Sequence, residues 1–143
     1  MLVYLDTSAL AKWYLNEPGS ESFSEWIRSQ QDTHISTLTG LELRCLLARR
    51  KRAGELSTVI AQQVFATFQG DVERGYLIRH DMHDEQFVSA THLLDRLTPI
   101  ALRTLDALHL GVAHGIGAEC LATADRIMAQ AGRALGLTIF QPT

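Results

Sequence analysis

The stretch LVYLDTSAL (residues 2–10) combines an apolar run, an acid and two hydroxyl residues. Leu2–Leu5 has the length and composition of a buried strand, and Asp6 follows it directly. The hydroxyl residues after Asp6 can cap a helix that extends to Tyr14, because a side-chain hydroxyl accepts a hydrogen bond from an otherwise unpaired helical N–H. A buried strand that ends in this way carries a carboxylate to the edge of a sheet.

The rest of the chain alternates short apolar runs with longer segments of helical periodicity. Further strands are expected at His34–Thr37, Tyr76–Arg79, Cys120–Thr123 and Leu137–Phe140. Further helices are expected at Glu21–Ser29, Leu38–Arg52, Ser57–Gln69, Asp84–Leu97, Leu102–His114 and Arg126–Leu135. This alternation predicts right-handed crossovers. The predicted fold class is α/β, with a short parallel sheet of four to five strands and helices on both faces, in a single domain of residues 1–143.

Composition places the chain among ordinary globular proteins. Hydrophobic residues make up 46% and charged residues 20% of its 143 residues, and the formal net charge is −3. A pI near 6.0 argues against a general nucleic-acid coat protein, while it leaves room for a local basic patch. The sequence contains no apolar span of ~20 residues and no basic leader, so we expect a cytoplasmic protein without a membrane partner. Cys45 and Cys120 lie in apolar runs and are expected to be buried free thiols.

Three further acids occupy positions comparable to that of Asp6. Asp125 comes two residues after a predicted strand, whereas Glu42 and Asp106 lie near the starts of predicted helices, among apolar residues. Strand carboxyl ends and helix N-termini share one edge of a parallel α/β sheet, so these four acids can converge there. Each like-charged pair at ~4 Å costs ~4 kcal/mol at an effective dielectric of ~20. Cations must therefore offset the repulsion, or some of the acids must be protonated.

Oxygen-only ligands favour Mg²⁺ or Mn²⁺, which also bind substrate phosphate. A site of this kind can activate water and neutralise charge on a phosphodiester, so the predicted reaction is metal-dependent phosphodiester hydrolysis. Taken singly, the acids have simpler interpretations: Asp125 can cap the helix that follows it, and Glu42 can be an ordinary acid at a helix start. Asp106 is harder to explain in this way, because an acid among leucines needs a partner.

Four segments together resemble the PIN-domain family, and specifically VapC-type toxins of toxin–antitoxin pairs. The segments are YLDTSAL at residues 4–10, TGLEL around Glu42, LRTLDALHL around Asp106, and LATADRIMAQAGRALGL around Asp125. The resemblance extends over the whole chain. It implies a three-layer α/β/α fold and a Mg²⁺- or Mn²⁺-dependent endoribonuclease.

The resemblance also implies roles for individual residues. The catalytic, metal-binding acids would be Asp6, Glu42, Asp106 and Asp125. The supporting hydroxyl residues, which can orient a carboxylate, would be Thr7, Ser8 and Thr123. The partners it implies are an RNA substrate, a small VapB-type antitoxin and a second copy of the chain in a homodimer.

Two further residues have open roles. Arg44, in the basic segment RCLLARRKR, is a candidate contact for RNA or antitoxin, although cations near a helix C-terminus can also simply face solvent. His109 lies three residues after Asp106 and thus on a neighbouring part of the same helical face. It can support the acids or the fold, and a role as general base is also conceivable.

Other function classes share some of these features. A Mg²⁺-dependent phosphoacceptor normally has an acidic pair after its first strand, where this chain has Asp6 followed by Thr7. A phosphatase with Asp6 as nucleophile usually has a second acid two residues on, where this chain has Ser8. A PIN-type scaffold that binds without catalysis is a third alternative.

Overall fold

The computed structural model describes residues 1–142, which form a parallel sheet and seven helices. The strands are β1 (Val3–Leu5), β2 (Thr33–Ser36), β3 (Ile78–His80), β4 (Cys120–Ala122) and β5 (Thr138–Phe140). The helices are α1 (Thr7–Tyr14), α2 (Ser20–Arg28), α3 (Thr37–Arg52), α4 (Thr58–Glu73), α5 (Asp84–Arg96), α6 (Thr104–Gly115) and α7 (Arg126–Ala134). All neighbouring strands are parallel, in the order β3-β2-β1-β4-β5. The predicted α/β class and parallel sheet are confirmed.

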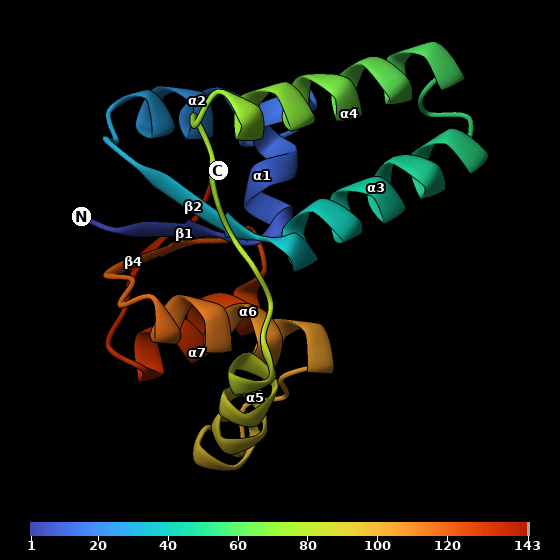
Figure 1. Ribbon diagram of the computed structural model, residues 1–143. Helices are drawn as coiled ribbons and strands as arrows, with labels where there is room; N and C mark the ends of the chain where they lie inside the picture. Colours follow the sequence, from blue (N-terminus) through green and yellow to red (C-terminus); the bar gives the residue numbers. More distant parts are fainter. Residues whose placement is uncertain (143) are drawn as a thin grey trace.

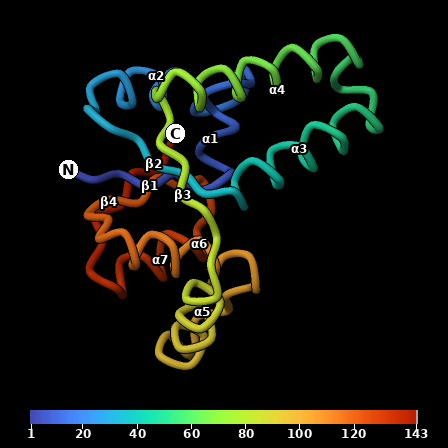
Figure 2. The backbone as a smooth tube through the Cα atoms, viewed as in Figure 1, coloured from blue at the N-terminus to red at the C-terminus, as the bar shows by residue number. Residues whose placement is uncertain are grey.

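Helices cover both faces of the sheet, as Figure 1 shows. Helices α1 and α2 and the hairpin of α3 and α4 lie on one face, and α5, α6 and α7 lie on the other. The trace in Figure 2 shows the chain passing from one helical layer to the other through the edge strand β3. The predicted three-layer α/β/α arrangement is therefore confirmed.

Strand β1 contributes side chains to both layers. Val3 and Leu5 belong to the core under α1–α4, whereas Tyr4 belongs to the core under α5–α7. All three are fully buried, because alternate residues of a strand face opposite sides and helices cover both sides here. The apolar run that ends at Asp6 is thus the central strand of the molecule.

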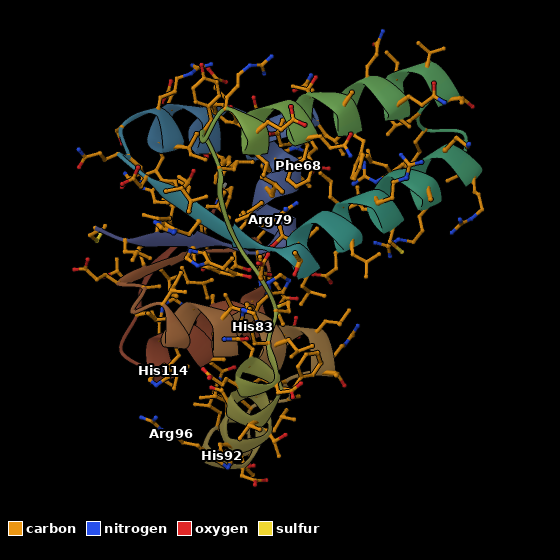
Figure 3. The ribbon with its side chains drawn as sticks, in the orientation of Figure 1. Phe68, Arg79, His83, His92, Arg96 and His114 are labelled. Atoms are coloured by element: carbon orange, nitrogen blue, oxygen red, sulfur yellow. The ribbon has the colours of Figure 1, made fainter. Side chains whose placement is uncertain are left out.

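Aromatic side chains join α4 to α1. Phe68 lies between these helices in Figure 3, and its ring meets that of Tyr14 edge-on, with centroids 6.1 Å apart. The Tyr14 hydroxyl also donates to Asp71 of α4 at 2.5 Å. These contacts fix the α3–α4 hairpin to the helix that follows Asp6.

Gly111 permits a close crossing between α5 and α6. A Cβ atom at this position would lie 2.9 Å from the backbone carbonyl oxygen of Gln86 on α5. Because that neighbour is backbone and cannot rotate away, a larger residue would push the two helices apart. The crossing matters for function because α6 carries Asp106 and His109.

Some local predictions differ from the structure. Helix α6 begins at Thr104 rather than at Leu102, because Arg103 has an extended backbone (φ −94°, ψ 167°). Cys120 is buried as expected, but the prediction for Cys45 is wrong: it is exposed on α3. An apolar run on a helix contains positions that face away from the core, and Cys45 is one of these. Within residues 1–142, the structure contains no helix long and apolar enough to cross a membrane.

Candidate active site with four carboxylates

The sheet contains a switch point between β1 and β4. Strands β2 and β3 continue the sheet on one side of β1, and β5 continues it beyond β4. At such a point the connections diverge and leave a crevice outside the carboxyl ends of the two strands. Asp6 directly follows β1, and Asp125 lies three residues after the end of β4.

A cavity of about 870 Å³ opens at this edge of the sheet. Its lining includes all four predicted acids: Asp6, Glu42, Asp106 and Asp125. They come from four separate segments of the chain, and the fold brings them around one space. The strand order also differs from the order 2-1-3-4-5 of receiver-like folds, so the sheet gives no support to the phosphoacceptor alternative.

Asp6 is buried and held by three donors. Its Oδ1 accepts hydrogen bonds from the Ala9 backbone N–H at 3.0 Å and from Ser8 Oγ at 2.7 Å, and its Oδ2 accepts from Thr123 Oγ1 at 2.5 Å. The Ala9 bond also makes Asp6 the N-cap of α1. Burial raises the pKa of Asp6 above its ordinary value, although His109 and the three donors act in the opposite direction.

Glu42 projects from α3 and is half-buried. Its Oε1 accepts from Thr7 Oγ1 at 2.8 Å and makes a short contact with Nε2 of His109. Burial alone would raise the pKa of Glu42. The pKa is lowered instead, because the hydrogen bond and positive charge of His109 outweigh burial, with help from the Thr7 hydroxyl and Arg49. Glu42 is therefore held as a carboxylate.

The other two acids lie at helix N-termini. Asp106 is in the first turn of α6 and accepts one long hydrogen bond, from the Arg103 backbone N–H at 3.4 Å. Burial raises its pKa, and the charges of Asp125 and Asp6 raise it further. Asp125 is exposed and caps α7 by accepting from the Met128 N–H at 3.0 Å. Its interpretation as a helix cap is confirmed, and the same residue lines the cavity.

The three predicted supporting hydroxyls all contact these acids or their backbone. Thr7 donates to Glu42, and Ser8 and Thr123 donate to Asp6. Ser8 Oγ also accepts from the Ala124 backbone N–H at 2.9 Å, which ties the start of α1 to the end of β4. Each hydroxyl thus donates a hydrogen bond to a carboxylate, and the supporting role in the site that the resemblance implies for them stays a prediction.

Two arginines on the cavity wall were not singled out as site residues from the sequence, although Arg49 belongs to the basic segment RCLLARRKR. Arg49 lies seven residues after Glu42 on α3, so the 3.6-residue period places it on the same helical face; Arg103 precedes α6. The period could have identified Arg49 from the sequence. Arg103 offered no such signal, because its place depends on where α6 begins.

Arg44 lies elsewhere. Its guanidinium carbon lies 5.0 Å from the centroid of the Phe65 ring on α4, and its side chain lines a separate cavity of about 90 Å³ between α3 and α4. It is two residues from Glu42 and hence on another face of the helix. Its contact with RNA or antitoxin stays a prediction.

The donor set suits a hard divalent cation. Carboxylate oxygens are the ligands that Mg²⁺ and Mn²⁺ prefer. Burial is the main cause of the raised pKa of Asp106, and a cation would relieve the further contribution from the charges of Asp125 and Asp6. Within residues 1–142, no three His, Cys, Asp or Glu side chains are already arranged to hold a metal ion. The residues therefore fit such an ion by chemistry and placement around one cavity, and the acids would have to draw together around it.

Comparisons with known proteins agree with this architecture. The PIN domain family model matches residues 3–134. Ribonuclease VapC46 of Mycobacterium tuberculosis (strain ATCC 25618 / H37Rv) is 30% identical over 144 residues, covering 99% of this chain and 98% of that protein. Ribonuclease VapC47 of M. tuberculosis (strain CDC 1551 / Oshkosh) is 28% identical over 151 residues, covering 99% of this chain and 97% of that protein.

Solved structures share the fold at lower identity. VapC20 of Mycobacterium tuberculosis, described as a sarcin–ricin loop cleaving toxin, aligns with a TM-score of 0.72 and 16% identity, covering 91% of this chain and 95% of that one. DNA-bound VapBC from Salmonella typhimurium aligns with a TM-score of 0.68 and 19% identity, covering 100% of both chains. The resemblance inferred from the four sequence segments is confirmed, and this chain belongs to the PIN-domain family.

Proposed function

We propose that this protein is a Mg²⁺- or Mn²⁺-dependent endoribonuclease and the toxin of a VapB–VapC-type toxin–antitoxin pair. The observation that carries the proposal is the convergence of Asp6, Glu42, Asp106 and Asp125 around one cavity at the switch point of the sheet. The ribonuclease names of the two curated relatives support the same reaction class.

In this proposal the four acids bind the cation and share its charge. Asp6 and Glu42 are held in place by hydrogen bonds from Thr7, Ser8, Thr123 and His109. Asp106 of α6 and Asp125, which caps α7, would complete the ligand set. A bound divalent cation would supply activation of the attacking water and neutralisation of charge on the phosphodiester.

Arg49 and Arg103 would hold the RNA backbone. Both line the same cavity as the acids and carry permanent positive charge, so each can contact a phosphate on either side of the scissile bond. The cavity wall also contains apolar side chains, Leu38, Leu41, Leu46 and Leu105. Sugars and bases, or apolar residues of an antitoxin, can pack against them.

The proposed partners are a VapB-type antitoxin and a second copy of the chain. Among structures of this fold, one is described as VapBC2 from Rickettsia felis bound to a DNA fragment from their promoter. Exposed apolar side chains on α5, Phe87, Val88 and Leu94, offer a surface for dimerisation, which light scattering of the purified chain would detect. An RNA substrate and such an antitoxin would place the protein in the cytoplasm.

The test is an RNA cleavage assay on the purified chain. Labelled tRNA, rRNA fragments and messenger RNA are incubated with Mn²⁺ or Mg²⁺, with excess EDTA, and with the variants Asp6→Asn and Asp106→Asn. Asp95→Asn is the matched control, because Asp95 is exposed on α5, outside the cavity. We expect cleavage in wild type and Asp95→Asn with metal, and loss of cleavage with EDTA or in either cavity variant.

Two outcomes would contradict the proposal. Cleavage that survives both EDTA and the cavity substitutions would exclude the metal mechanism. RNA binding without cleavage at any metal concentration would favour the non-catalytic PIN-type module. Growth arrest on expression, relieved by co-expression of the partner antitoxin and absent for Asp6→Asn, would identify the protein as a toxin rather than a housekeeping nuclease.

A further inference from the structure

A buried chain of hydrogen bonds leads from the centre of the sheet to the cavity. His109 of α6 is 3% exposed, and its Nε2 contacts Glu42 Oε1. Its Nδ1 lies 2.7 Å from the hydroxyl oxygen of Tyr4, which in turn lies 3.0 Å from Ser36 Oγ. Tyr4 and Ser36 are both fully buried, at the centre of β1 and the end of β2. The chain thus links three elements, β1, β2 and α6, to Glu42 on α3.

The chemistry of the end groups fixes the direction of the last bond. A carboxylate offers only acceptors, so Nε2 of His109 must carry the proton that bridges to Glu42. In a neutral imidazole, Nδ1 accepts from the Tyr4 hydroxyl, and Ser36 donates to the Tyr4 oxygen. In a charged imidazole, Nδ1–H donates to the Tyr4 oxygen, and the Tyr4 hydroxyl donates to Ser36. In both arrangements Nε2–H donates to Glu42, and Tyr4 anchors the opposite edge of the ring.

This bond determines which oxygen of Glu42 faces a ligand. Oε1 takes both protein donors, Thr7 Oγ1 and His109 Nε2. Oε2 has no hydrogen-bond donor among residues 1–142. Two donors from different elements fix the carboxylate plane of a long, flexible side chain, and they leave one oxygen available for the cation.

We infer that His109 is a positioning residue that holds Glu42 in its ion-binding orientation, and that Tyr4 acts through His109 by fixing the imidazole ring. The inference rests on the proposed function, because it assigns Glu42 to the cation. It also answers the alternative of a general base. His109 lines the cavity, but both of its ring nitrogens are engaged and the ring is 3% exposed, so neither nitrogen is free to take a proton from an attacking water.

The experiment measures Mn²⁺ affinity by isothermal titration calorimetry on the purified full-length chain after removal of metal. His109→Leu fills the same space without donors, and we expect its dissociation constant to rise by about 10–100-fold. His109→Gln keeps an N–H that can reach Glu42, and Tyr4→Phe keeps the imidazole. Each should therefore show a smaller loss of Mn²⁺ affinity, of about tenfold.

Tyr14→Phe is the matched control, because it also removes a tyrosine hydroxyl hydrogen bond, to Asp71, in the other core of the protein. Both tyrosine variants are expected to lower Tm, and only Tyr4→Phe is expected to weaken Mn²⁺ binding. Because Tyr4 acts through His109, adding Tyr4→Phe to His109→Leu should weaken Mn²⁺ binding no further.

Several results would overturn the inference. They are wild-type or tighter Mn²⁺ affinity in folded His109→Leu, equal losses in Tyr4→Phe and Tyr14→Phe, or additive losses in the double variant. Where His109→Leu does not fold, His109→Gln and Tyr4→Phe decide the question. Measurements on wild type and Asp6→Asn separate this failure from failure of the proposed function. If wild type itself does not bind Mn²⁺, the proposed cation site is wrong. If Mn²⁺ affinity is lost in Asp6→Asn but retained in the His109 variants, only the role of His109 is rejected.

Discussion

The acids of the cavity form two pairs, Asp6 and Glu42 on one wall, and Asp106 and Asp125 on the other. The two walls differ in how firmly they hold their acids. Asp6 and Glu42 accept hydrogen bonds from side chains of neighbouring elements, and donors to each include a residue far away in the sequence. Among residues 1–142, Asp106 accepts a single long bond, from the backbone, and the carboxylate of exposed Asp125 is held only as a helix cap. Asp6 and Glu42 are therefore held in place by contacts between elements, whereas Asp106 and Asp125 are held less firmly.

If the site binds a divalent cation as proposed, this difference suggests how four acids can share one cavity before the cation binds. Clustered carboxylates repel one another, so a site with all four acids rigidly at ion-binding distance would destabilise the fold. Fixing Asp6 and Glu42 with donors while half-buried Asp106 and exposed Asp125 are held less firmly limits that repulsion. In the proposed function, part of the metal-binding energy would then draw Asp106 and Asp125 towards Asp6 and Glu42.

The largest expected effect comes from the firmly held wall. Asp6→Asn removes the charge of a buried carboxylate, which is a proposed cation ligand, while it keeps the shape and the N-cap oxygen. We expect cleavage to fall on the order of 10³-fold, since loss of an ion that stabilises transition-state charge costs several kcal/mol. Without metal, Tm should be unchanged or higher, because burial disfavours the charged form of Asp6. A cleavage time course and a thermal melt in EDTA measure the two effects; a much lower Tm would show that Asp6 is structural.

The loosely held wall should respond less. Asn is also a good N-cap, so Asp125→Asn is expected to preserve α7. Because Asp125 is exposed and its charge is screened, we expect a loss of activity on the order of tenfold, recovered in part at higher Mn²⁺ concentration. The measurement is cleavage rate against Mn²⁺ concentration. A loss as large as that of Asp6→Asn, with no recovery, would remove the distinction between the two walls.

The sequence predicted the layers and the placement of the four acids at one edge of the sheet, because both are encoded locally. A strand that ends at Asp6 and hydroxyls in the next two positions form a short-range pattern, and helical periodicity outlined the layers. The acids after other strands and at helix starts follow from the rule that these ends share one edge of a parallel sheet. Such features need no knowledge of which helix packs where.

The contacts between the elements could not be predicted in this way. His109 and Glu42 are 67 residues apart, and their contact depends on the crossing of α6 with the sheet. The exposure of Cys45 likewise depends on which face of α3 meets α1 and α4. Arg49 is an intermediate case: its spacing from Glu42 placed it on the right face, but only the structure shows that this face borders the cavity.

Substitutions at Arg49 and Arg44 test whether RNA contacts the cavity wall or the surface between α3 and α4. Arg49→Gln should weaken RNA binding several-fold and reduce the slope of log affinity against log salt by about 1, the value for one phosphate contact. Arg44→Gln is the matched control, because it removes an arginine that packs on Phe65, outside the cavity. We expect a slightly lower Tm and unchanged RNA affinity for it. Filter binding at several salt concentrations measures both, and the opposite result would support the sequence-based prediction for Arg44.

The smallest expected effect concerns stability in metal-free protein: the contributions of Asp106 and Glu42 to stability should depend on pH with opposite signs. The pKa of Asp106 is raised above 3.8, so its contribution to stability is complete below that pH and is lost as pH rises through the folded pKa. The pKa of Glu42 is lowered below 4.5, so its contribution is present above that pH and is lost as pH falls through the folded pKa.

Between about pH 4 and about pH 7 in EDTA, Asp106→Asn should therefore gain Tm relative to wild type, by roughly 2 °C, whereas Glu42→Gln should lose Tm relative to wild type. Adding Mn²⁺ at about 100 times its dissociation constant should stabilise wild type by about 2.7 kcal/mol at neutral pH and remove the advantage of Asp106→Asn. Differential scanning fluorimetry across this pH range measures each curve. Parallel curves for the two variants would mean that both acids lie in equivalent surroundings, and that the contrast between the two walls has no energetic counterpart.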